Sequence, residues 1–370
     1  MKKAVYLLLL CFFLFVLSFT AFCTGESYGI KEELEESFFG SVDNEVYEIL
    51  EDFGLDSFDA ENVFSRGIEN IKTYFSDTLK DKLREISGWF FTLVSIILLL
   101  SIVSSAFDFS MSSDAFSLFT CAVICVATTG KISSFLNCVL SSMALNGKLM
   151  LSFIPVYALL ISLSGNPTSA LTYNSFLLFF CQAVNFFLDN IFVSITGTYF
   201  ALSIAFSFNH AINLNRFING ANRITSLVLG SSATLFTGLL SLKNVIAVST
   251  DSLSVKGVRY LLSNLVPVIG SSLSEAYSSV IGSINLMKGS VAIIGIFALA
   301  ILNIPALTEG VIYFFLMTLL SCISEVLALY RVSELLRAFA GCVKILLLVC
   351  LFQLFVLIIS IGLMLTLRGG

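Results

Sequence analysis

The sequence predicts an all-α, polytopic integral membrane protein with about six to eight transmembrane or re-entrant helices, preceded by a signal segment and a short acidic helical extracytoplasmic region. Three observations predict this class. Hydrophobic residues make up 57% of the chain and charged residues only 12%, which is the composition of a membrane protein. Apolar runs of span length recur after residue 88, and most acidic residues precede them. We therefore divide the chain into residues 1–25, 26–87 and 88–370.

Residues 1–25 have the layout of a secretory signal peptide. Two lysines precede an apolar run from Ala4 to Leu17, and small residues follow this run. Ala21-Phe22-Cys23 is an acceptable cleavage site, so either a cleaved or a retained signal peptide fits the sequence. In both cases we expect the residues that follow to be translocated across the membrane.

Residues 26–87 are predicted to form two amphipathic helices separated by a break at Phe53-Gly54-Leu55-Asp56-Ser57. Residues 26–88 hold 17 of the 25 acidic residues but only 6 of the 20 basic ones, a local net charge of −11. This charge argues against binding nucleic acid or anionic headgroups, whose phosphates need Lys and Arg, and it would suit a basic partner. About 60 residues without disulfides build little core, so we expect this region to pack against the membrane domain or a partner.

The membrane domain begins at Trp89, a residue typical of a membrane interface. Successive apolar segments follow, interrupted by residues 131–144, whose two faces predict a helix that lies in the interface or re-enters the membrane. Residues 171–208 are long enough for two spans or for one long tilted helix. The other predicted spans, some weak and some clear, are 89–107, 115–130, 149–164, 224–242, 290–305, 310–330 and 343–367.

Polar residues within two of these apolar segments are candidates for a polar path or for a helix-packing face. Gln182 and Asp189 lie seven residues apart with Asn185 between them, so a continuous helix would place all three on one face. An aspartate at the bilayer centre costs about 2.5–3.5 kcal/mol, so Asp189 should face other helices or water. The alternative is that Asp189 and Asn190 mark a turn between two spans. Glu325 is a second carboxylate in a predicted span.

The small-residue-rich central stretch, residues 253–290, is too polar for an ordinary span and too apolar for a solvated loop. After Pro267 the apolar residues recur at three- and four-residue steps, which predicts a two-faced helix. Its polar face either lines water or lets another helix approach closely, because small residues permit tight backbone contact. This face carries Ser271, Ser274, Glu275, Ser278 and Ser279.

The run from Lys256 to Gly270, KGVRYLLSNLVPVIG, together with the segments LSEA from Leu273 and VIGS from Val280, resembles the signature region of the stage III sporulation protein AE family. The resemblance extends to the layout of the chain, because that family also begins with a signal-like segment and a short polar region before a polytopic membrane domain. The residues that carry the resemblance are Lys256, Gly257, Arg259, Asn264, Pro267, Gly270, Glu275 and Gly282.

This resemblance implies a membrane component of the secretion-like channel complex that endospore-forming bacteria build between mother cell and forespore. The chain would be a multi-pass protein of the mother-cell membrane around the forespore, and would act as a platform or conduit subunit in support of late forespore gene expression. Its implied partners are other membrane proteins of the same sporulation operon, including a secretion-type ATPase and ring-forming proteins. The resemblance also implies contact with a forespore membrane protein across the intermembrane space, and with the lipid bilayer. The family brings no catalytic residues with it.

The sequence contains none of the common catalytic motifs that we looked for. It lacks the patterns GxxxxGK[ST], HExxH, GxSxG and CxxC, and its single histidine, His210, leaves a general base scarce. We therefore expect no enzymatic activity, no cofactor and no metal site.

Two other functions fit the sequence. One is a secondary transporter for a small solute, in which Asp189, Glu275 and Glu325 would bind ions or substrate, and the other is a purely structural anchor for ring-forming partners.

Overall fold

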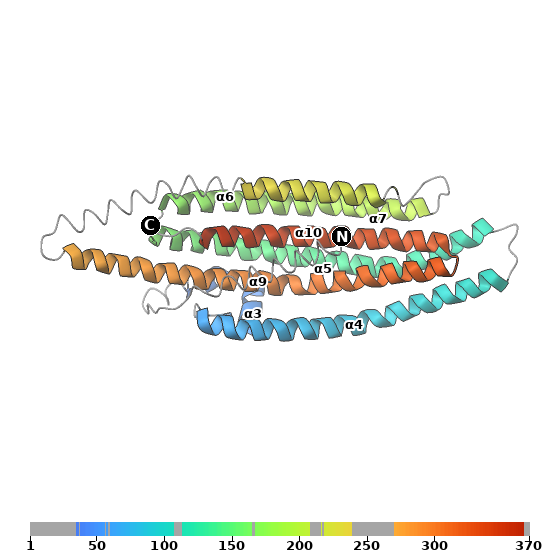
Figure 1. Ribbon diagram of the computed structural model, residues 1–370, viewed down its shortest axis with the longest axis horizontal. Coiled ribbons are helices and arrows are strands. Elements are labelled where there is room, and N and C mark those ends of the chain that lie inside the picture. Colours follow the sequence, from blue (N-terminus) through green and yellow to red (C-terminus); the bar gives the residue numbers. More distant parts are fainter. Residues whose placement is uncertain are drawn as a thin grey trace.

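The protein is an elongated bundle of long helices that lie roughly side by side (Figure 1). The structure is a computed structural model, and it describes residues 35–36, 38–55, 57, 60–106, 113–164, 167–207, 216, 218–238 and 270–365. All regular secondary structure in these residues is helical, which confirms the predicted all-α class. The predicted signal segment, residues 1–25, lies outside the described residues.

No break in the backbone helix separates the acidic region from the first apolar span. Helix α4 (Ala60–Ala106) runs for 47 residues and joins the second amphipathic helix to the first apolar span without a break. Gly88 and Trp89 lie inside this helix, so the boundary between hydrophilic and apolar sequence at residue 88 is a change of surface and not of backbone conformation.

Three further helices merge segments that the sequence analysis separated. Helix α5 (Ser113–Leu163) combines two predicted spans and the interfacial segment between them, and α9 (Gly270–Val326) combines the end of the central stretch with two predicted spans. Pro155 and Pro305 lie inside these helices and do not end them, because the surrounding helices hold the backbone in place on both sides of each proline. Helix α10 (Tyr330–Leu365) follows after a short turn.

The predicted count of six to eight spans is therefore too high for the described part of the chain. Four of its helices are long and apolar enough to cross a membrane, namely Gly67–Ser105, Ala115–Leu163, Met287–Val326 and Tyr330–Gly362. Two shorter apolar helices cover Asn174–Phe186 and Ser194–Ala205. A window of bilayer length counts a helix of 57 residues as two or three segments, which explains the excess.

Residues 171–207 form one helical path and not two spans with a turn. Helix α6 (Pro167–Phe186) passes into a π-helical segment, η2 (Phe187–Phe192), and then into α7 (Val193–Ser207). The backbone stays helical through Asp189 and Asn190, so the proposed turn at these residues is wrong. Because a π-helical turn inserts an extra residue, it rotates the residues that follow onto a different face.

Helix α9 is the centre of the bundle and contacts α4, α5 and α10 along its length. Glycine permits two of the closest approaches. A Cβ atom on Gly295 would lie 2.6 Å from the Phe153 ring of α5, and one on Gly310 would lie 2.5 Å from Leu347 of α10 and 2.7 Å from the Phe135 ring of α5. These glycines therefore set the distance between the axes of the three helices.

Helix α3 (Asn44–Asp52) belongs to the acidic region and lies against the bundle. Asp43 caps its first turn, and Gly54, with φ +67°, closes its last turn, where the Leu55 amide donates to the Leu50 carbonyl. This end has the pattern of a Schellman motif and confirms the predicted break after Phe53. The buried side chains that join α3 and the preceding residues to the bundle core are Phe38, Val42, Val46, Leu50 and Leu55.

We predict that Gly310→Ala destabilises the protein although alanine is the better helix former. The added methyl group collides with Leu347 and Phe135, and such overpacking costs about 1–3 kcal/mol. Gly130→Ala in α5 is the control, because a Cβ atom there meets nothing within 4 Å. Thermal unfolding of the purified protein in detergent measures both, and equal midpoints for the two variants would contradict the close approach of α9 and α10.

Candidate functional site

A cluster of side-chain amides lies in the interior of the bundle, where α5, α9 and α10 meet. Asn146 of α5 and Asn303 of α9 exchange two hydrogen bonds, with Nδ2 to Oδ1 distances of 3.1 and 3.0 Å. Asn146 also donates to Oε1 of Gln353 on α10 at 3.2 Å. All three side chains are buried. We call Asn146, Asn303, Gln353 and their partners Ser142 and Asn185 the amide cluster.

The outer members of the amide cluster connect it to the backbone and to α6. Ser142 donates to the Leu302 carbonyl, and Gln353 donates through Nε2 to the Met143 carbonyl and to Asn185 Oδ1, both at 3.2 Å. Gly147 makes room for α6 here, because a Cβ atom at this position would lie 2.6 Å from Asn185 Nδ2. Four helices are thus joined through one hydrogen-bonded group.

The amide cluster is uncharged, and it holds the helices in a fixed arrangement. Amides neither titrate near neutral pH nor act as nucleophiles, and buried amides that satisfy one another fix the rotation and axial register of the helices that carry them. To slide or turn, α5, α9 and α10 would each have to break more than one hydrogen bond and α6 one, so the amide cluster defines one arrangement of these four helices.

An ion-pair chain, Glu309–Lys82–Glu85–Lys131, joins three helices at another level of the bundle. Glu309 of α9 is almost fully buried and lies 2.9 Å from Lys82 Nζ of α4. Lys82 lies 3.8 Å from Glu85 on its own helix, and Glu85 lies 3.1 Å from Lys131 Nζ of α5. A buried carboxylate needs such a partner, because burying an unpaired charge costs several kcal/mol.

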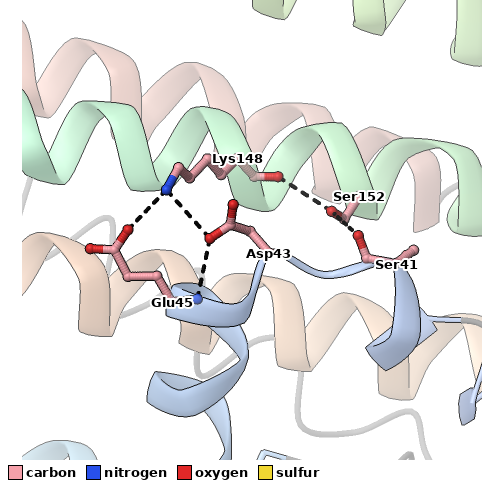
Figure 2. Close-up of polar contacts among 5 residues, drawn as sticks. All are labelled: Ser41, Asp43, Glu45, Lys148 and Ser152. Carbon is pink, nitrogen blue, oxygen red and sulfur yellow. Dashed lines mark hydrogen bonds and ion pairs between the residues drawn. The ribbon is translucent and has the colours of Figure 1, made fainter.

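Polar contacts also attach the acidic region to α5 (Figure 2). Lys148 Nζ lies 3.3 Å from Asp43 Oδ1 and 2.9 Å from Glu45 Oε2, and Ser152 donates to the Ser41 carbonyl at 2.7 Å. Figure 2 shows Asp43 serving two roles, since the same oxygen that faces Lys148 accepts from the Glu45 amide. The ion pairs are half-exposed and contribute little energy, so they orient α3 while the buried apolar side chains hold it.

The structure separates the residues that were predicted to share a polar face. Asn185 belongs to the amide cluster, whereas Gln182 is exposed. Asp189 lies in the π-helical segment η2, which interrupts the continuous α-helix that the predicted polar face requires. Glu325 lies one residue before the end of α9 and pairs with Arg337 of α10 at 2.8 Å, with half of its side chain exposed.

The first part of the central stretch, residues 253–269, lies outside the described residues. The predicted helix after Pro267 is present from Gly270, so the backbone at Ser271, Ser274, Glu275, Ser278 and Ser279 is helical. Gly282 is exposed and Ile284 buried, as expected for the two faces of this helix. The signature residues Lys256, Gly257, Arg259, Asn264 and Pro267 lie outside the described residues.

Sequence reasoning missed most of these interior residues. Asn146, Asn303 and Gln353 are widely spaced amides inside apolar helices, and Glu309 is the one charged residue of α9 between Lys288 and Glu325. Such isolated polar residues in apolar sequence were the available signal. Among the residues that the structure describes, no group of three His, Cys, Asp or Glu side chains is arranged to hold a metal ion.

Comparisons with known proteins agree on one family. The family model described as stage III sporulation protein AE matches residues 51–367. A protein named stage III sporulation protein AE from Bacillus subtilis (strain 168) is 24% identical over 234 residues, which cover 62% of this chain and 58% of that protein. The match thus spans a little over half of the relative's length. No solved structure matches the chain.

We predict that Asn303→Leu destabilises the bundle by about 1–3 kcal/mol, because it leaves the buried amide of Asn146 with one partner fewer. Asn190→Leu is the control, since Asn190 is exposed and its side-chain amide donates to the Phe186 carbonyl one turn earlier in the same helical path. Thermal unfolding in detergent compares the two. Equal losses of stability would mean that the amide cluster does not hold the helices together.

Glu309→Gln and Glu325→Gln form a second matched comparison. Both carboxylates belong to α9 and pair at 2.9 and 2.8 Å, but the Glu309 side chain is 5% exposed and that of Glu325 is 52% exposed. We expect Glu309→Gln to cost about 1.5–3 kcal/mol and Glu325→Gln less than about 1 kcal/mol. The free energy of unfolding, measured by denaturant titration, checks this order, and a larger loss for Glu325→Gln would contradict it.

Proposed function

The chain belongs to the stage III sporulation protein AE family, and on this premise we propose that it is a membrane component of the secretion-like channel complex between mother cell and forespore. The observation that carries the proposal is the family match over residues 51–367. The matched range includes all four helices that are long enough to cross a membrane. In this role the chain supports late forespore gene expression during endospore formation.

Within that complex we assign the chain the role of a platform, in preference to a path through its own interior. The polar side chains of the amide cluster bond to one another and to backbone carbonyls. A solute path would instead need polar groups directed toward water. Helices locked in one register suit a subunit that positions its neighbours.

The proposed location is the mother-cell membrane around the forespore, with the acidic region on the extracytoplasmic side. The proposed partners are other membrane proteins of the same operon, including a secretion-type ATPase and ring-forming proteins, and a forespore membrane protein across the intermembrane space. The ATPase would supply the energy, because we assign no catalytic step to this chain. The exposed carboxylates on α3 suit a basic surface on one of these partners, since Glu48, Glu51 and Asp52 face away from the bundle.

Deleting the gene in its own endospore-forming host tests this proposal. We expect normal growth, loss of most heat-resistant spores and low activity of a late forespore reporter, with full recovery when the wild-type gene is restored. A fluorescent fusion should mark the membrane around the forespore. Normal spore yield in the deletion strain, or a fusion confined to other membranes, would contradict the proposal.

A further inference from the structure

Charged residues from α4, α5, α9 and α10 lie near one level of the bundle, and this level divides it. Lys131 is the one charged residue of α5 between Asp114 and Lys148, and Glu309 is the one charged residue of α9 between Lys288 and Glu325. The ion-pair chain places both beside Glu85, the last charged residue of α4. On α10, Lys344 is within one turn of Leu347, which faces Gly310.

On one side of this level the surface of the bundle is apolar. We call this part the apolar half, and it contains α4 from residue 86, α5 to residue 130, α9 from residue 310, the start of α10 and α7, whose Tyr199 donates to the Ala338 carbonyl of α10. Many of its exposed side chains are large and hydrophobic, and these include Phe91, Leu99, Ile102, Phe119, Val126 and Phe315. Its exposed charges include Glu325 and Arg337, which pair with each other near the α9–α10 turn. The α9–α10 turn lies at the far end of this half, where Ser101 of α4 donates to the Leu327 carbonyl at 3.5 Å.

The length of the apolar half matches a bilayer. Residues 86–106 of α4 contain no charged side chain, and at 1.5 Å per residue they span about 32 Å. The uncharged stretches 115–130 of α5 and 310–324 of α9 span about 24 and 23 Å, and their flanking charges can reach the headgroups. The hydrocarbon layer is about 30 Å thick.

On the other side of the level, charged and apolar sequence lie side by side. We call this part the mixed half, and it contains α3, the charged part of α4, α6, the end of α5, the start of α9 and most of α10. The outer surface of α4 here carries exposed charges such as Glu69, Lys72 and Lys80. Figure 1 shows α3 and this part of α4 alongside α9, so this flank needs water.

Burial within the protein explains the apolar sequence of α9 and α10 in the mixed half. The 18-residue stretch that makes each helix a candidate span is 78% buried in α9 and 72% in α10, but only 22% in α4 and 28% in α5. An apolar residue that is buried by protein needs no lipid, whereas exposed apolar residues such as Phe91 and Leu99 of α4 do.

We propose that the bilayer surrounds the apolar half alone, with its surface at the ion-pair chain, and that the mixed half projects out of the hydrocarbon layer. The two halves together are too long for one bilayer, since α9 alone measures about 85 Å over its 57 residues. Hydropathy alone would place the ends of α5 and α10 in lipid, and the geometry places them outside it. This inference concerns the position of the membrane and does not rest on the proposed sporulation role.

Nitroxide labels at matched positions test the proposal in nanodiscs that contain the purified chain. Thr73 and Thr92 are exposed threonines on α4, one in each half, and Ser175 of α6 and Ser95 of α4 are exposed serines, again one in each half. Each is replaced by cysteine in a chain whose native cysteines are changed to alanine or serine. Power saturation then compares collision with a water-soluble nickel chelate against collision with oxygen, which concentrates in lipid.

We expect nickel to dominate at Thr73 and Ser175 and oxygen at Thr92 and Ser95. Ser175 is the decisive position, because the same surface of α6 exposes Leu171 and Phe179. Oxygen dominance at Ser175 would place the mixed half in lipid and overturn the proposal, as would nickel dominance at Thr92 and Ser95. Because the chain is studied alone, neither outcome depends on whether it belongs to a sporulation complex.

Discussion

Asn146 and Asn303 exchange hydrogen bonds in the interior of the bundle, and the position of every central helix follows from that pair. Polar amides in apolar surroundings must find partners, because each unsatisfied group costs about 1–3 kcal/mol. Only one rotation of α5 against α9 brings the two amides together. Gln353 then fixes α10 and Asn185 fixes α6, so one buried contact constrains four helices.

The ion-pair chain adds a second constraint at a different height. It joins the acidic helix α4 to α5 and α9, and it is the point at which the outer surface of α4 changes from charged to apolar. The two constraints act in different ways. The amide cluster sets how the central helices pack against one another, and the ion-pair chain sets where the bundle meets its surroundings.

Hydropathy and spacing predicted the all-helical class, the break after Phe53, the end of α5 before Gly165 and the helix that begins after Pro267. They failed where the outcome depended on the partners of a residue. Pro305 was expected to end a span, yet it lies within α9, because burial by neighbouring helices stabilises the helix on both sides of it. The sequence pattern did not predict the π-helical turn at Asp189, and this turn interrupts the helix that was expected to carry one polar face.

The candidate site shows the same limit. Asn185 was found because it lay beside other polar residues, whereas Asn146, Asn303 and Gln353 lie far from any other amide of their own helices. They become a site only when three segments distant in sequence meet. A single amide in an apolar run indicates a buried partner, but the sequence does not say which one. Glu309 is the clearest case, because its partner, Lys82, comes from the region that the sequence assigned to a separate domain.

The arrangement around the amide cluster is tested most directly by cross-linking α5 to α9 in native membranes. Cysteines at Ser142 and Asn303, whose side-chain oxygens lie 3.5 Å apart, should form a disulfide on mild oxidation. A protease site introduced between residues 239 and 269 makes the result visible, since cross-linked fragments stay together after cleavage. A control variant has cysteines at Ser142 and Ser290, which belong to the same two helices but lie several turns apart along the bundle. Its fragments should separate after cleavage. Efficient cross-linking of the second pair, or failure of the first, would contradict the account.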